Sequence, residues 1–146
     1  MNTTIFEQIK KINEYGQEYW SARDLYKILG YTEYGKFLPA IERAKKACET
    51  SGNPIKDHFA GVSEMIKIAT GTPKEAMREV DDYHLSRYAC YLIAQNGDPR
   101  KEEIALAQTY FAIQTRKQEI QELQKLLDED IQRMTFRKEI KRLPAN

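Results

Sequence analysis

The sequence lacks the features that mark several large classes of protein. No run comes near the roughly 20 apolar residues that a membrane-spanning helix needs, and the polar start has no apolar segment like that of a signal peptide. The 146 residues carry 23 basic and 22 acidic side chains, for a net charge of +1. This value excludes the overall positive field of a strongly basic nucleic-acid-binding protein. Any site for a polyanion must therefore be a local patch.

Cysteine, histidine and glycine are also sparse. Cys48 and Cys90 lie in apolar helical patterns, which indicates buried free thiols in the reducing cytoplasm rather than a disulfide. His58 and His84 have no cysteine, histidine or carboxylate cluster at metal-ligand spacing. The seven glycines stand singly, so there is no glycine-rich phosphate loop. We therefore expect no metal, no cofactor and no enzymatic activity.

Cap and turn residues predict short helices in the first third of the chain. The apolar spacing over residues 4–12 favours a helix, and a strand is the competing prediction. Farther along, Ser21 is placed to cap a helix, with Trp20 before it and Leu25 after it as a hydrophobic staple. Gly30 stands where helices commonly end in a left-handed residue. We therefore expect a helix between Ser21 and Gly30.

The middle of the chain carries mixed signals. A helix is predicted over residues 33–49, but Pro39 implies that it restarts there or that a separate turn precedes it. After the cap residue Asn53, apolar residues repeat every three or four positions from Ile55 to Ile66, which favours another helix. Residues 66–84 are expected to hold a small hairpin or an ordered loop.

Two helices are predicted to meet at the sequence NGDP. Ser86 caps the first helix and Gly97 closes it, while Asp98 and Pro99 begin the second. The second helix then meets no helix-breaking residue nearly to the end of the chain. Because such a length is unusual in a compact domain, we expect the far part either to project or to fold back, with the change near residues 116–119. The predicted fold class is mainly α with a minor β element (α+β): a compact helical domain and then a long C-terminal amphipathic helix.

The C-terminal part of the chain combines an apolar stripe with an asymmetric charge pattern. The stripe consists of Ile120, Leu123, Leu127, Ile131, Met134 and Ile140. Five acidic residues and one lysine give residues 118–130 a charge of −4, and five basic residues and one glutamate give residues 131–146 a charge of +4. Such a helix complements itself when paired antiparallel. We predict an antiparallel homodimer, or packing of the same stripe on its own domain; a single helix that obeys the helix-dipole rule is the alternative.

Cations gather on and beside the two helices between residues 20 and 50. They are Arg23, Lys27, Lys36, Arg43, Lys45 and Lys46. A standard helix-turn-helix is disfavoured, because Tyr26 is large where that motif needs a small residue and Pro39 interrupts its second helix. The cations can still contact DNA phosphates. The alternative is a solvated helix face balanced by Glu42 and Glu49.

Several blocks of the sequence resemble one bacterial family. The stretch LSRYACYLIAQNGDPRKEEIALAQTYFAIQTRKQE, residues 85–119, closely resembles the signature region of the DNA-damage-inducible protein D family. Earlier blocks, among them YWSARDLYKILGYTEYGKF and RAKKACETSGNPIKDHF, extend the resemblance over nearly all of residues 6–119. Members of that family usually continue with a second half, so this chain resembles the N-terminal half or a shortened member.

A second resemblance is shorter. Trp20, Asp24 and the sequence Leu29-Gly30-Tyr31 are similar to the Bro-type N-terminal domain of phage antirepressors. The expected organisation is a globular domain over residues 1–117 and a helical tail over 118–146. Together the two resemblances imply a non-enzymatic DNA-associated regulator of the bacterial DNA-damage (SOS-type) response. Its partner would be DNA, with single-stranded DNA among the candidates, or a DNA-bound protein. The alternative is an antirepressor-like module that sequesters a regulator or a DNA-repair protein.

Overall fold

The computed structural model describes residues 4–67 and 77–142, apart from the side chains of Thr4, Lys67 and residues 140–142. It divides the chain into two compact units, Met1–Ala112 and Ile113–Asn146. Helices predominate and accompany one four-stranded antiparallel sheet, which confirms the predicted α+β class. Within the described ranges, no helix is both long and apolar enough to cross a membrane.

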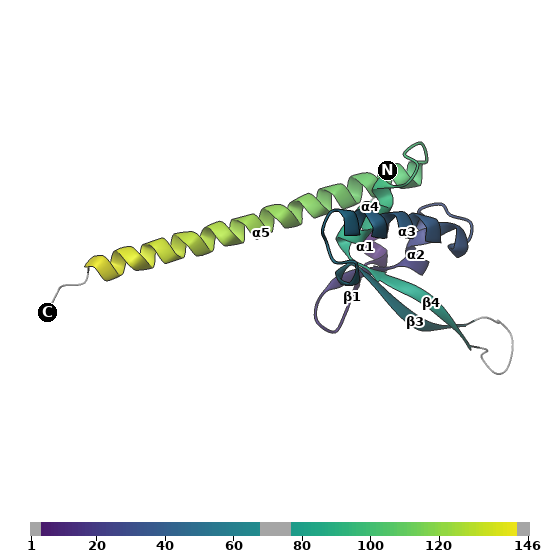
Figure 1. Cartoon of the computed structure of the whole chain (residues 1–146), viewed down its shortest axis with the longest axis horizontal. Coiled ribbons are helices and arrows are strands. Elements are labelled where there is room, and N and C mark those ends of the chain that lie inside the picture. The colour runs from purple at the N-terminus through teal and green to yellow at the C-terminus, as the bar shows by residue number, and fades with distance from the viewer. Residues whose placement is uncertain (1–3, 68–76, 143–146) are drawn as a thin grey trace. The chain divides into compact units, whose positions relative to one another are not determined.

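The sheet has the strand order β1-β2-β4-β3 (Figure 1). Its strands are β1 Lys11–Ile12, β2 Glu18–Ser21, β3 Phe59–Lys67 and β4 Met77–Leu85. β3 and β4 pair antiparallel from Phe59 opposite Leu85 to Lys67 opposite Met77, as the predicted hairpin requires. The rest of that predicted region, residues 68–76, lies outside the described residues.

The helix predicted from Ile55 to Ile66 is wrong. Only a 3-10 turn, Ile55–Asp57, precedes the strand β3. The spacing of three and four residues occurs by coincidence, because pairing with β4 supplies every residue from Phe59 to Ile66 with a strand partner. Gly61, a poor helix former, lies in the middle of the segment.

The N-terminal helices follow the predicted signals more closely. α1 covers Thr4–Ile9. Lys11 and Ile12, at the end of the segment 4–12 for which the sequence favours a helix, form β1. α2 covers Ala22–Ile28, and Gly30 follows it with a φ of 85°, the left-handed conformation expected of a terminating glycine.

α3, Tyr34–Thr50, is continuous through Pro39, so the predicted restart is wrong. Proline removes the hydrogen bond to the carbonyl four residues earlier, which belongs to Gly35. Both Gly35 and Pro39 are exposed, and water can therefore bind that carbonyl. The opposite face of α3 is buried through Phe37, Ile41 and Cys48.

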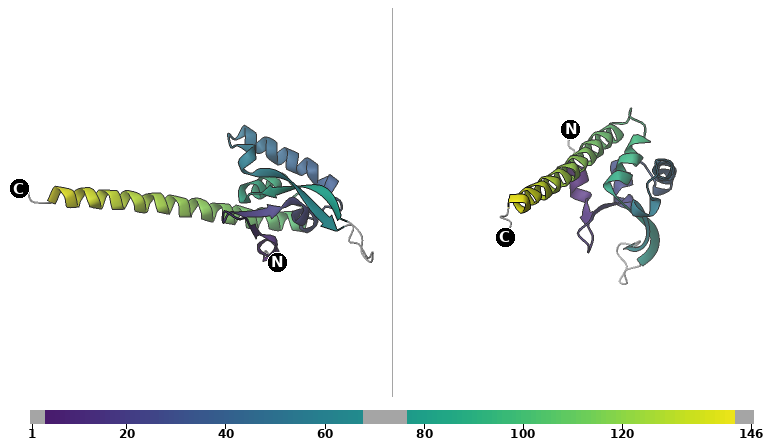
Figure 2. Two further views of the ribbon diagram at one scale, coloured as in Figure 1. Left: turned by 90° about the horizontal axis from the view of Figure 1, so that it is seen from below. Right: turned by 60° about the vertical axis from the view of Figure 1, so that its left-hand side comes forward.

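α4, Arg87–Gln95, begins at Ser86, whose hydroxyl accepts a hydrogen bond from the backbone N–H of Ala89 at 3.0 Å, as predicted. It packs against α3, and both helices lie on the same side of β3 and β4 (Figures 1 and 2). Cys48 and Cys90 are buried free thiols, as predicted.

α5 is a single helix, Glu102–Arg142, that continues through residues 116–119, so of the two predicted alternatives the fold-back at that point is wrong. The segment contains no proline or glycine. Side-chain pairs also span the point in question, Arg116 with Glu119 at 3.2 Å and Gln118 with Glu122 at 3.1 Å. These local contacts therefore keep α5 continuous beyond the length that is usual in a compact domain.

The core of the first unit is centred on Trp20. Its indole is fully buried, and Nε1–H donates to the carbonyl of Phe6 at 2.8 Å. Phe111 lies edge-on to this ring, with 5.2 Å between ring centroids, and Phe6 lies 5.3 Å from Phe111. The core therefore joins α1, β2 and the first turns of α5, and it fixes the sheet beneath the helices.

Gly97 allows the close approach of α4 and α5. A Cβ at this position would lie 2.8 Å from Cγ2 of Ile104, a fully buried side chain. We expect Gly97→Ala to lower the free energy of unfolding by about 1–3 kcal/mol, the usual cost of overpacking. The measurement is urea denaturation, with Gly35→Ala as the control because a Cβ there meets no atom within 4 Å. Equal stability of the two variants would contradict this role.

Candidate nucleic-acid interface

Asp82 of β4 holds the start of α2. Its side chain is only 2% exposed, and Oδ1 accepts the backbone N–H of Arg23 at 3.0 Å. The Ser21 hydroxyl donates to Oδ2 of the same carboxylate. Ser21 was expected to cap α2 itself, but its side chain makes no cap hydrogen bond, so that prediction is corrected. A carboxylate from a distant strand takes over this role.

Asp82 also belongs to a small cluster of polar side chains on β3 and β4. Nε2 of His84 lies 2.9 Å from Oε1 of Glu64, and one oxygen or nitrogen from each of the three residues lies within 4.8 Å of the others. Burial raises the pKa of Asp82, whereas the hydrogen bond with His84 lowers that of Glu64. The expectation that His84 has no carboxylate cluster at metal-ligand spacing is therefore wrong, because the register of β3 and β4 places Glu64 and His84 on one face, on either side of the Val62–Asp82 pair.

The same three side chains are of types that bind metal ions. Both oxygens of Asp82, however, already accept hydrogen bonds from Ser21 and Arg23, and His84 is paired with Glu64. Internal bonds thus account for the geometry, and we assign the cluster to the connection between β4 and α2. The absence of a bound metal stays a prediction.

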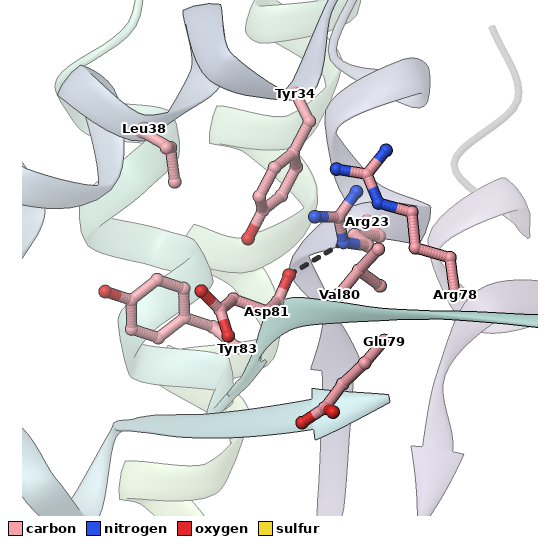
Figure 3. Close-up of a pocket in the computed structure, with 8 residues that line it drawn as sticks. All are labelled: Arg23, Tyr34, Leu38, Arg78, Glu79, Val80, Asp81 and Tyr83. Atoms are coloured by element: carbon pink, nitrogen blue, oxygen red, sulfur yellow. Dashed lines mark hydrogen bonds between the residues drawn. The ribbon is translucent and has the colours of Figure 1, made fainter. Parts of the chain in front are cut away.

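A groove of about 390 Å³ lies between β4 and the helices α2 and α3 (Figure 3). It is lined by Arg23, Tyr34, Leu38, Arg78, Glu79, Val80, Asp81 and Tyr83. The arginines are beside each other at one side of the groove, and Tyr83 lies at the other (Figure 3). Arg23 was among the cations named from the sequence, but Arg78 was not. Arg78 lies in residues 66–84, for which the sequence left a hairpin and an ordered loop as alternatives.

Arg23 is held in a fixed orientation. Its guanidinium carbon lies 4.0 Å from the centre of the Tyr34 ring, a cation–π arrangement, and its Nε–H donates to the carbonyl of Asp81 at 2.7 Å. The backbone N–H of Arg23 donates to Oδ1 of Asp82. The backbone and the guanidinium of Arg23 are therefore both hydrogen-bonded to β4.

Tyr34 directs its hydroxyl into the groove, toward Asp81 and Tyr83 (Figure 3). The hydroxyl oxygen is buried and has no hydrogen-bond partner within the described part of the chain. Burial, together with the negative charge of Asp82, raises the pKa of Tyr34 to about 12. The phenol is therefore neutral at physiological pH and keeps its proton.

Lys45 approaches the same groove from α3. Its Nζ lies 5.2 Å from the centre of the Tyr83 ring and 3.4 Å from the Tyr83 hydroxyl. It also forms an ion pair with Glu42 at 3.4 Å. Arg23 and Lys45 thus both contact aromatic residues that line the groove.

The other cations named from the sequence point elsewhere. Arg43 donates to the carbonyl of Asn96, after the end of α4, at 3.4 Å. Lys36 donates to Thr32 at 3.4 Å, while Lys27 lies 5.8 Å from the ring centre of Tyr26. Lys46 is exposed on the outer face of α3. The six cations therefore do not converge on one surface.

Residues 8–112 match the BRO family, N-terminal domain. The chain belongs to this family. The groove lies within the BRO N-terminal domain, because all of its lining residues fall in the matched region. Over 138 residues the chain is also 54% identical to DNA damage-inducible protein D of Escherichia coli (strain K12), a match that covers 93% of this chain. Both resemblances drawn from the sequence are thereby confirmed.

The chain covers 49% of the Escherichia coli protein, about half of its length. No solved structure matches the chain. The matched BRO N-terminal domain ends at residue 112, the last residue of the first compact unit, so the rest of α5 lies beyond it.

The connection through Asp82 can be tested by substitution. We expect Asp82→Ala to lower the free energy of unfolding by about 2 kcal/mol, because it removes a helix cap and leaves the buried Ser21 hydroxyl without its acceptor. Urea denaturation measures the change. Asp81→Ala is the matched control, since Asp81 is exposed and binds Arg23 through its backbone carbonyl. A loss of the same size in both variants would contradict the assignment.

Proposed function

We propose that this chain is a non-enzymatic, DNA-associated regulatory domain of the bacterial DNA-damage (SOS-type) response, and that DNA binds in the groove beside Arg23 and Arg78. The observation that carries this proposal is the arginine pair at a groove into which the Tyr34 hydroxyl points, a buried group with no hydrogen-bond partner among the described residues. The name of the Escherichia coli relative supports the connection with DNA damage. The family match supports a regulatory rather than a catalytic role.

The arginine pair suits a phosphate group. A guanidinium presents several N–H donors in one plane and binds phosphate oxygens in pairs. Arg23 is already oriented by Tyr34 and Asp81, so it loses little conformational freedom on binding. Arg78 is exposed and can turn toward the same phosphate.

The aromatic residues suit the bases. Tyr34, which contacts Arg23, and Tyr83, on the opposite side, both line the groove, and aromatic rings provide stacking surfaces for the bases of single-stranded nucleic acid. Asp81 and Glu79 repel phosphates but accept hydrogen bonds from the amino groups of bases. This mixture limits purely electrostatic affinity and favours strands whose bases are accessible.

The proposal predicts salt-sensitive binding that depends on Arg78. We expect Arg78→Gln to raise the Kd for a fluorescent oligonucleotide roughly five- to tenfold, because one charge-assisted contact is lost. The slope of log Kd against log salt should also change by about one. Fluorescence anisotropy with single- and double-stranded oligonucleotides over a salt series measures both quantities.

Arg43→Gln is the matched control, because Arg43 has the same charge but contacts the carbonyl of Asn96 instead of the groove. Its Kd should stay within about twofold of the unmodified chain, a change smaller than one exposed ion pair provides. Equal weakening by both substitutions would support a diffuse cationic surface instead of the groove. No salt-sensitive binding by the unmodified chain at low salt would overturn DNA association itself.

A second function is favoured by the C-terminal helix. Large apolar side chains of α5 beyond residue 112 are exposed, and the net charge of the whole chain is only +1. Both properties suit an antirepressor-like module that sequesters a regulator or a DNA-repair protein. Affinity capture from cells with damaged DNA would test it, and failure to retain any protein would count against this function.

A further inference from the structure

The helix of the second unit is continuous to Arg142 (Figure 2). It carries a row of exposed apolar side chains. The row consists of Ile120, Leu123, Leu127, Ile131 and Met134. Ile140, which the sequence pattern assigned to the same stripe, has its side chain outside the described part of the structure. An exposed apolar row of this length is typical of a surface that contacts another chain.

The spacing of this row is the same in both directions. Successive members are 3, 4, 4 and 3 residues apart, so Leu127 is the midpoint of a palindrome. On a continuous α-helix such spacings keep all five side chains on one face. A face that is symmetric about its midpoint matches a copy of itself that runs in the opposite direction.

We infer that two copies of the chain pair antiparallel along this face, about a twofold axis at Leu127. Leu127 then meets Leu127 of the second copy. Ile120 lies opposite Met134 of the second copy, and Leu123 lies opposite Ile131. Every layer of the contact is apolar on both sides, as a symmetric helix pair requires.

The flanking charges agree with the same alignment. Antiparallel pairing about Leu127 brings Glu119 and Glu122 near Arg137 and Arg133 of the second copy. Within one helix, Glu119 pairs with Arg116 at 3.2 Å, and Arg133 pairs with Asp130. These residues are exposed, so their charges can also interact across the dimer.

A parallel pair fits less well. In a parallel alignment each residue lies beside its own copy, which places Glu119 and Glu122 beside like charges and does the same for Arg133 and Arg137. The palindromic spacing also has no significance in a parallel pair. The charge order thus distinguishes the two directions, and it selects the antiparallel one.

The full chain should be a dimer that depends on Leu127. We expect sedimentation velocity to show a dimer at micromolar concentration and a monomer for Leu127→Lys, because the twofold axis places the two new charges next to each other. Leu126→Lys is the matched control: Leu126 is 58% exposed and Leu127 48%, but Leu126 lies outside the apolar row. It should remain a dimer. Far-UV circular dichroism verifies that both variants keep their helix content.

Disulfide cross-linking tests the direction. A mixture of Ile120→Cys chains and Met134→Cys chains should form a mixed disulfide, whereas Ile120→Cys chains alone should not cross-link through position 120. Cys48 and Cys90 are buried and supply the background control in the unmodified chain. A monomeric unmodified chain, an equal loss of dimer in both lysine variants, or efficient cross-linking of Ile120→Cys chains alone would each overturn the proposal.

Discussion

The carboxylate of Asp82 connects strand β4 to helix α2, two of the elements that form the groove of the BRO N-terminal domain. It lies on β4, yet it binds the first turn of α2 and the hydroxyl of Ser21 on β2. Arg23 follows directly in that turn, and its guanidinium returns to β4 through the carbonyl of Asp81. Without this connection the arginine would have no fixed place beside Tyr34. The groove thus depends on an ionisable group that is nearly inaccessible to water, a costly arrangement that its hydrogen bonds make tolerable.

Local sequence signals predicted the elements that local contacts determine. The cap at Ser86 and the left-handed Gly30 are as expected, because each depends on neighbours within a few residues. The buried cysteines are also as expected, because each lies on the apolar face of a helix whose pattern is visible in the sequence. The strand β3 was predicted as a helix, because its stability comes from β4, whose paired residues lie up to 26 positions away in the sequence, as Phe59 and Leu85 do. For α5 the sequence left two alternatives open, and the local side-chain pairs are sufficient to keep the helix continuous.

The candidate site was only partly predictable for the same physical reason. Arg23 stands out as a cation on a capped helix, but its contacts with Tyr34 and Asp81 arise from tertiary packing. Arg78 and the group of Glu64, Asp82 and His84 could be found only from the register of β3 and β4. An alternation of apolar and polar residues over residues 77–85 would have indicated the strand β4. Charged residues at successive positions conceal this alternation. Among the cations named from α3, Lys45 contacts Tyr83 at the groove, whereas Lys36 and Arg43 bond Thr32 and Asn96, so charge alone does not show which of them can act together.

The central claim is that a nucleic acid occupies the groove beside Arg23. Nuclear magnetic resonance of the full chain, titrated with a short single-stranded oligonucleotide, tests it most directly. If the oligonucleotide binds in the groove, the Nε–H signal of Arg23 and the ring signals of Tyr34 and Tyr83 will shift together and saturate at one binding constant. Shifts confined to the side chains of Lys36, Arg43 and Lys46, with the groove signals unchanged, would contradict it.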